Sequence, residues 1–359
     1  MKEKRVARQI AMLFIGSIVG AGLSSGRELN QFFGVYGYKS LVGLFICAVA
    51  YVWVGTMIID ISVKYKTKSY NELVEVVCPK WIGAFTNITL TLFLVSSTSI
   101  IFAGSSAVIH QYFGVPKWIG FLCMLGCSVL FLMRHTKGLF EVNNFVVPFL
   151  LVTMTCIFFG AVHKQSEVLT ISYLQSLPYK KGSYLPSTII YAGFNIISII
   201  GVITPITQEI KDKQAIKRGI LLGTIGLTIM SCFITFLMII NPTYPKQYEI
   251  PILAVASQVG KMFQIGLLMV IWLEMFSSQI SNIYSLTRCL ETQFHLSYQK
   301  GMWLVILIAI PFAKFGFSNL VEVLYPIYGL LSLLFVGCVI YFYMRQKICI
   351  VLRKKIGMR

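Results

Sequence analysis

Long apolar runs separated by short polar segments dominate the sequence. A helix needs about 20 apolar residues to cross the hydrocarbon core of a bilayer. Ten runs approach or exceed that length, at residues 8–33, 38–63, 82–112, 117–134, 140–162, 185–207, 216–241, 262–287, 301–316 and 318–345. The runs are uniformly apolar rather than alternating, which excludes the strands of a membrane β-barrel. The pattern therefore predicts an all-α membrane protein with ten transmembrane helices.

A longer polar segment, residues 163–184, divides these runs into two groups of five. An odd number of spans per half makes the second half enter the membrane from the opposite side, which is the geometry of an inverted repeat. In each half, glycine interrupts the first run, and a longer loop follows the second, with short helices expected near 70–78 and 251–261. We expect one transmembrane domain, 1–359, with a first repeat at 1–162, a second at 163–359, and discontinuous helices at the first and sixth positions.

Composition agrees with lipid as the main solvent. The chain is 57% hydrophobic and 12% charged, which leaves too little charge to cover a soluble protein of 359 residues. The net charge of +18 would suggest nucleic acid in a soluble protein. Here most Lys and Arg residues fall on alternate connections that share a side with the N-terminus, as the positive-inside rule requires. We expect a multi-pass protein of the bacterial inner membrane with both termini cytoplasmic, and no binding to nucleic acid.

The first run is rich in glycine and ends in charged residues. It contains Gly16, Gly20, Ala21, Gly22, Ser24, Ser25, Gly26, Arg27 and Glu28. Each glycine weakens a helix by roughly 0.8–1 kcal/mol relative to alanine, and irregular backbone at membrane depth must be satisfied by protein or by a water-filled cavity. The spacing of Gly16 and Gly20 also suits close helix packing. Packing alone does not require a charged pair directly beyond it, so we predict an unwound binding segment.

The sixth run carries a polar stripe on one helical face, formed by Ser187, Tyr191, Asn195 and Ser198. Gly193 and Phe194 lie in the middle of that stripe. One interpretation is a second interrupted helix that contributes to a binding site. The alternative is a hydrogen-bonded seam between two helices.

The eighth run carries a second stripe, formed by Glu274, Ser277, Ser278, Ser281 and Ser285. A carboxylate inside a span is costly and usually faces a cavity or a partner. The alternative is a structural ion pair, or a protonated and hydrogen-bonded glutamate. We expect the first, sixth and eighth spans to converge on one polar cavity near the midplane, lined by Gly20, Gly22, Ser24, Gly193, Asn195 and Ser278.

Two motifs resemble a known family. The stretch from Gly20 to Glu28, followed by Gln31-Phe32-Phe33, is similar to the first-span signature of the bacterial YkvI family of membrane proteins. The stretch Tyr191-Ala192-Gly193-Phe194-Asn195 and the turn Glu209-Ile210-Lys211-Asp212 fit the same family, and the resemblance covers the whole chain. That family resembles the amino acid–polyamine–organocation superfamily, which implies the five-plus-five LeuT-like fold.

The fold resemblance also implies ligands. It implies a sodium site formed by the carbonyls of Gly16 and Val19 and the hydroxyls of Ser277 and Ser278, and it places Arg27 near an external gate. Glu28 and Glu274 are the alternative, as carriers of a proton. The implied substrate-binding residues are Gly20, Ala21, Gly22, Ser24, Ser25, Arg27, Glu28, Tyr191, Gly193, Phe194, Asn195 and Glu274.

We therefore expect a secondary active transporter of a small solute, an amino acid or related metabolite, coupled to sodium or protons and needing no other cofactor. The alternative is a membrane subunit like those of spore germinant receptors, which have similar length and architecture and would sense a small ligand or pass ions. The sequence contains no HExxH motif and no P-loop, so we expect neither an enzyme nor an ATPase. It does not indicate a protein partner.

Overall fold

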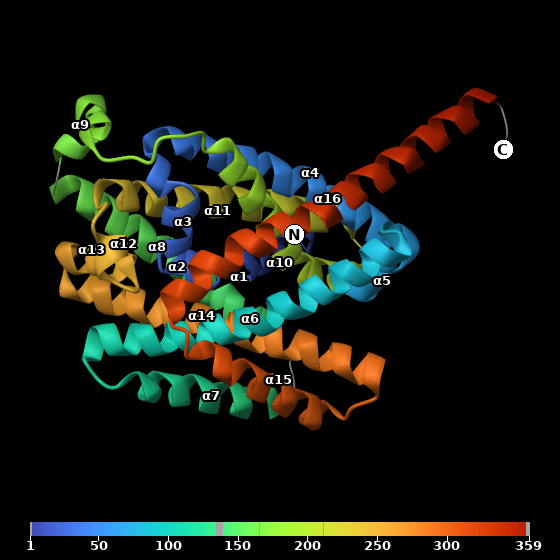
Figure 1. The fold of residues 1–359 in the computed structure, drawn as a ribbon. Helices are drawn as coiled ribbons and strands as arrows, with labels where there is room; N and C mark the ends of the chain where they lie inside the picture. Colours follow the sequence, from blue (N-terminus) through green and yellow to red (C-terminus); the bar gives the residue numbers. More distant parts are fainter. Residues whose placement is uncertain (1, 134–138, 165, 211, 357–359) are drawn as a thin grey trace.

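A computed structural model describes residues 2–133, 139–164, 166–210 and 212–356. These residues form helices joined by short connections, with no strand among them (Figure 1). Lys211 of the Glu209–Asp212 motif lies outside the described residues. The all-α prediction is therefore confirmed for the described part of the chain.

The first predicted span is divided into three helices, α1 (Lys2–Ile18), α2 (Ala21–Ser24) and α3 (Arg27–Phe32). The nine other predicted runs correspond to α4 (Leu41–Tyr65), α6 (Lys80–Phe113), α7 (Lys117–Met133), α8 (Leu139–Lys164), α10 (Leu185–Glu209), α11 (Lys213–Ile240), α14 (Lys261–Phe294), α15 (Tyr298–Ala313) and α16 (Phe317–Ile356). Seven of the described helices are long and apolar enough to cross a membrane, whereas α7 and α15 are apolar but shorter. The chain is a multi-span membrane protein.

Shorter helices occupy the connections. Two of them are the short helices expected from the sequence, α5 (Tyr70–Val77) and α13 (Pro251–Val259). The others are α9 (Ile171–Ser176), α12 (Tyr244–Gln247), and the 3-10 turns η1 (Gly34–Tyr36), η2 (Tyr38–Ser40) and η3 (Ser166–Leu169).

A glycine lies at each of the two interruptions of the first span. Gly20 takes an extended conformation that ends the helical path after Ile18. Gly26 has φ +81°, a left-handed conformation that side-chain-bearing residues rarely adopt, and a Cβ there would lie 3.1 Å from the sulfur of Met238. The predicted unwinding of this segment is therefore confirmed.

The predicted break in the sixth span is wrong. Helix α10 runs without interruption through Gly193. A Cβ on Gly193 would lie 2.6 Å from the hydroxyl oxygen of Ser332 and 3.1 Å from the carbonyl oxygen of Gly329, both on α16. Glycine is needed at this position for close approach of two helices, and not for a change of backbone direction.

The broken helix lies at the centre of the molecule. α1 packs mainly against α11, while α10 packs against α4 and α16. In Figure 1, α7 and α15 lie together at one side, and α16 crosses one face and extends beyond the body. Large apolar side chains such as Trp81, Val49 and Phe145 are exposed on outer helices. This arrangement suits a lipid-facing surface around a packed interior.

Candidate functional site

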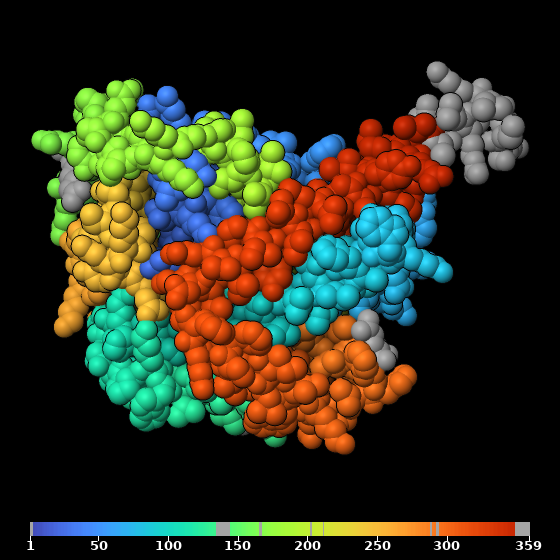
Figure 2. Space-filling model, in the orientation of Figure 1, coloured from blue at the N-terminus to red at the C-terminus, as the bar shows by residue number. Residues whose placement is uncertain are grey.

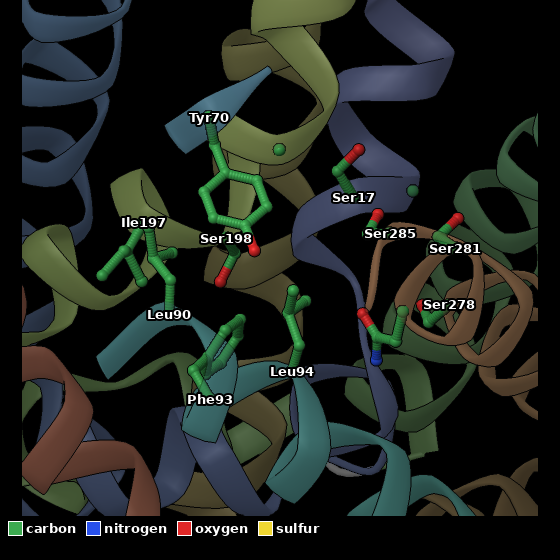
Figure 3. Close-up of a pocket in the computed structure, with 13 residues that line it drawn as sticks. Ser17, Tyr70, Leu90, Phe93, Leu94, Ile197, Ser198, Ser278, Ser281 and Ser285 are labelled. Carbon is green, nitrogen blue, oxygen red and sulfur yellow. The ribbon is translucent and has the colours of Figure 1, made fainter. Parts of the chain in front are cut away.

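A small cavity lies beside the end of α1. Its volume is about 50 Å³. Figure 3 shows the hydroxyl groups of Ser17, Ser198, Ser278, Ser281 and Ser285 gathered around it, together with the ring of Tyr70. The remaining lining residues are Gly16, Leu90, Phe93, Leu94, Ile197, Gly201 and Asn282. The lining is hydroxyl-rich and carries no charge, so the cavity suits water or a small polar group.

The first, sixth and eighth spans do meet at this cavity, but with few of the expected residues. Gly16 and Ser278 belong to its lining, whereas Gly20, Gly22, Ser24, Gly193 and Asn195 do not. Along α10, the lining residues Ile197 to Gly201 come after Tyr191 and Asn195. The cavity therefore lies on the side of the break toward the N-terminus and α5.

Beyond the cavity, Glu28 is buried beside the broken segment. The residue is 1% exposed, and its Oε1 atom has no hydrogen-bond partner within the described residues. Its Oε2 atom would lie 2.5 Å from a Cβ on Gly22, so only glycine leaves room for this carboxyl. The rings of Tyr51, Tyr191 and Tyr325 surround it.

The aromatic residues around Glu28 form one connected cluster. Phe194 stacks on Tyr325 with 4.4 Å between ring centroids, and Tyr191 meets Phe33 edge-on at 5.1 Å. The Asn195 side chain donates a hydrogen bond of 2.8 Å to the Tyr51 hydroxyl. Tyr191, Phe194 and Asn195, which the sequence singled out, therefore face the same buried region as Glu28.

Tyr51 and Tyr325 were missed by the sequence reasoning. They come from α4 and α16, and neither belongs to a polar stripe. The available signal was the position of a tyrosine hydroxyl in the middle of an apolar run, where the hydroxyl needs a polar partner.

On the side of the broken segment away from the cavity, Arg27 connects several elements. We call this side the closed face. Its guanidinium donates to Glu322 Oε1 at 2.7 Å, to the Tyr248 carbonyl at 2.7 Å and to the Glu249 carbonyl at 3.3 Å. The backbone N–H of Ile252 also donates to the Ser25 carbonyl at 3.1 Å. These bonds connect the broken segment to α16 and to the connection between α12 and α13. In Figure 2, blue atoms of the N-terminal region are visible between the 166–184 segment, α12–α13 and α16.

The two serines of the first-span motif donate hydrogen bonds to backbone carbonyls of the same segment. Ser24 Oγ donates to the Gly20 carbonyl at 2.8 Å, and Ser25 Oγ donates to the Gly22 carbonyl at 2.7 Å. Ala21, between Gly20 and Gly22, is 1% exposed. These bonds stabilise the irregular backbone in place of the helical bonds that the breaks remove.

Glu274 is the second buried carboxyl. It is 0% exposed, and neither of its carboxylate oxygens has a hydrogen-bond partner in the part of the chain that the structure describes. It lies one helical turn from Ser278 on the same face of α14, although it does not line the cavity. A carboxyl in this state needs a proton or a cation to compensate its charge.

Two of the four residues implied for a sodium site line the cavity, and two do not. Gly16 and Ser278 line one cavity, which fits a shared oxygen site, while Val19 and Ser277 are buried and do not line it. Within the described residues, no group of three or more His, Cys, Asp or Glu side chains could hold a metal ion. Any cation bound here would depend on hydroxyl and carbonyl oxygens.

Comparison with known proteins agrees with this architecture. No family model matches the chain. The chain is 26% identical over 340 residues to the uncharacterized membrane protein YkvI of Bacillus subtilis, covering 94% of this chain and 96% of that protein. It is 22% identical over 343 residues to the protein YyaD of the same organism, with the same shares covered.

Solved structures share the fold at low identity. A sodium-coupled sialic acid symporter in a substrate-bound outward-open state matches with a TM-score of 0.68 and 16% identity, over 93% of this chain and 78% of that one. MhsT in complex with L-phenylalanine matches with a TM-score of 0.66 and 13% identity, over 92% and 88%. Mhp1, a nucleobase-cation-symport-1 family transporter, matches with a TM-score of 0.60 and 11% identity, over 89% and 74%. The chain therefore resembles the YkvI proteins along nearly its whole length and has the LeuT-like fold of these symporters.

Proposed function

We propose that this protein is a secondary active transporter of a small solute, coupled to sodium or protons by alternating access. The observation that carries the proposal is the broken first helix, which holds a buried carboxyl between a closed face and a cavity. Discontinuous helices with sites near the midplane are the usual architecture of such transporters. The fold neighbours, which include sodium-coupled symporters, support the proposal.

The proposal includes two inverted repeats of five spans each. The repeats would comprise α1–α8 and α10–α16, divided by the segment 163–184. Their second and third spans are joined through short helices, α5 in one half and α13 in the other. This correspondence supports an inverted repeat, with α10 as an unbroken counterpart of the first span.

We place the solute between the broken segment and α10, where Gly22, Glu28, Tyr191 and Phe194 lie close together. Arg27 has its donors occupied by Glu322 and two carbonyls, so in this state it holds the closed face and does not bind the solute. Glu28 Oε1 has no hydrogen-bond partner among the described residues, and the charge of this carboxyl needs a proton or a cation when the face is closed. Rearrangement of the Arg27 contacts would open the site at the closed face, on the side away from the cavity.

Ion coupling through the hydroxyl-lined cavity has a direct test. If Gly16, Val19, Ser277 and Ser278 hold sodium, then adding sodium chloride raises the melting temperature of the purified protein, and choline chloride does not. Ser278→Ala should abolish that shift. Ser257→Ala is the control, because Ser257 donates only to the Ala254 carbonyl in α13. An unchanged sodium shift in Ser278→Ala would move the ion away from this cavity.

Transport itself is tested in proteoliposomes. Amino acids and related metabolites that raise the melting temperature would be offered as labelled solutes, with an inward sodium gradient, an inward proton gradient or no gradient. We expect gradient-driven accumulation of at least one solute. Binding without accumulation under either gradient would reject the transporter and favour a ligand-sensing subunit.

A further inference from the structure

An apolar groove runs along the outer surface between α4 and α11. It encloses about 740 Å³. Its walls include Phe45, Val49 and Trp53 of α4 and Leu221, Ile225 and Ile229 of α11, all exposed. Both helices are long and apolar enough to cross a membrane. The groove therefore lies at the depth of lipid acyl chains.

One end of this groove leads to an ion cluster. Asp60 lies one helical turn beyond the groove on α4, and Lys217 lies one turn before it on α11. Asp60 Oδ1 forms ion pairs with Lys213 Nζ at 3.0 Å and with Lys217 Nζ at 2.6 Å. The lysine side chains keep 41% and 27% of their surface exposed, so they can reach another anion.

Two further lysines lie around the same cluster. Lys64 donates to the Gln346 side chain at 2.7 Å, and Lys347 lies 4.9 Å from the ring centroid of Tyr343. Tyr343 in turn donates to Asp60 Oδ2 at 2.9 Å. We call Lys64, Lys213, Lys217 and Lys347 the basic cluster. It holds four positive charges, and two of them pair with Asp60, which leaves an excess of positive charge beside the groove.

We propose that the groove and the basic cluster together bind an anionic phospholipid. An acyl chain would fill the groove, and the phosphate would lie at the basic cluster. Basic pockets between membrane helices on the cytoplasmic side are suited to anionic headgroups. Glu3 and Arg218 are paired at 2.5 Å, which puts the cluster at the same end of the molecule as the N-terminus. The charge pattern places that end at the cytoplasmic leaflet.

The ligand is a membrane lipid rather than a soluble phosphate. The apolar groove supplies most of the contact surface, and glycerol phosphate or inorganic phosphate has nothing to fill it. A zwitterionic lipid would fill the groove but would not offset the excess positive charge. The site should therefore prefer phosphatidylglycerol to phosphatidylcholine with identical acyl chains.

Lipid binding to the full chain can be measured by native mass spectrometry and by melting temperature in nanodiscs. We expect phosphatidylglycerol to bind and raise the melting temperature, and phosphatidylcholine to do so much less. Lys213→Gln and Lys217→Gln should each weaken phosphatidylglycerol binding about fivefold, which corresponds to about 1 kcal/mol per lysine near the surface. Ala48→Trp should weaken it without a change of charge, because Ala48 lines the groove.

Controls separate this site from general attraction to a basic protein. The double change Lys181→Gln and Lys246→Gln removes two exposed lysines elsewhere, and Val42→Trp enlarges an exposed residue of α4 outside the groove. Neither control should alter binding. Equal losses in the controls, equal affinity for both lipids, or an equal shift with inorganic phosphate would overturn the proposal. Each variant's melting temperature in phosphatidylcholine reports its folding, independently of transport.

Discussion

Arg27 and Glu28 are neighbours in the sequence, but their side chains have different partners. Arg27 forms an ion pair with Glu322 at 2.7 Å, whereas Glu28 is buried among tyrosines with no ion pair in the described structure. The first residues of α3 project in different directions, so one reaches α16 at the closed face and the other points to the interior. We therefore expect Arg27 to act in closure and Glu28 in ion or solute binding, and both roles can be tested.

Arg27→Gln should loosen the closed face. The change removes the ion pair with Glu322 and weakens the bonds to two carbonyls, and a hydrogen bond to a charged group contributes about 1.5–3 kcal/mol. We expect backbone amides of α3 and α13 to exchange hydrogen roughly tenfold faster, measured by mass spectrometry. Arg218→Gln is the control, because it breaks an exposed ion pair with Glu3. Unchanged exchange in Arg27→Gln would show that other contacts hold this face.

Glu28→Gln should abolish gradient-driven uptake while leaving the protein folded. Glutamine has nearly the same shape, so the close contact with Gly22 survives, but it cannot bind a proton or compensate a cation. The measurements are proteoliposome uptake and the melting temperature. Glu167→Gln, an exposed change in η3, should transport like the natural protein. Normal driven uptake by Glu28→Gln would remove Glu28 from the coupling mechanism.

Gly193→Ala and Gly201→Ala should have opposite effects within one helix. A methyl group at Gly193 meets Ser332 and a backbone carbonyl of α16, and overpacking of this kind costs about 1–3 kcal/mol. A Cβ on Gly201 meets nothing within 4 Å, so alanine there should be neutral or stabilising by up to about 1 kcal/mol. Melting temperatures in one detergent compare the two. A stable Gly193→Ala protein would contradict close packing of α10 on α16.

Tyr51→Phe should destabilise the protein more than Tyr65→Phe. Each hydroxyl accepts a hydrogen bond from a side-chain amide, the buried Tyr51 from Asn195 and the exposed Tyr65 from Gln346. Loss of a buried partner costs about 1–3 kcal/mol, while a change at an exposed site stays within about 0.5 kcal/mol. Chemical or thermal unfolding of the two variants gives the difference. Equal effects would mean that the Asn195 bond contributes no more than a surface bond.

The sequence by itself determined the helices and the place of the first break. Hydrophobic runs report burial in lipid directly, so α4, α6, α8, α10, α11, α14 and α16 follow from residue pattern alone. Four glycines before a charged pair marked the broken segment, because glycine weakens a helix wherever it occurs.

The partners of the polar residues were decided only by the tertiary structure. Gly193 looked like a second break, but its role depends on the distance to α16, which one helix's sequence does not contain. Glu322 pairs with Arg27, 295 residues away in the sequence. Tyr51 and Tyr325 complete the surroundings of Glu28 from distant spans. A sequence pattern records what each residue prefers locally, whereas a site is made by contacts between helices, and packing alone brings those together.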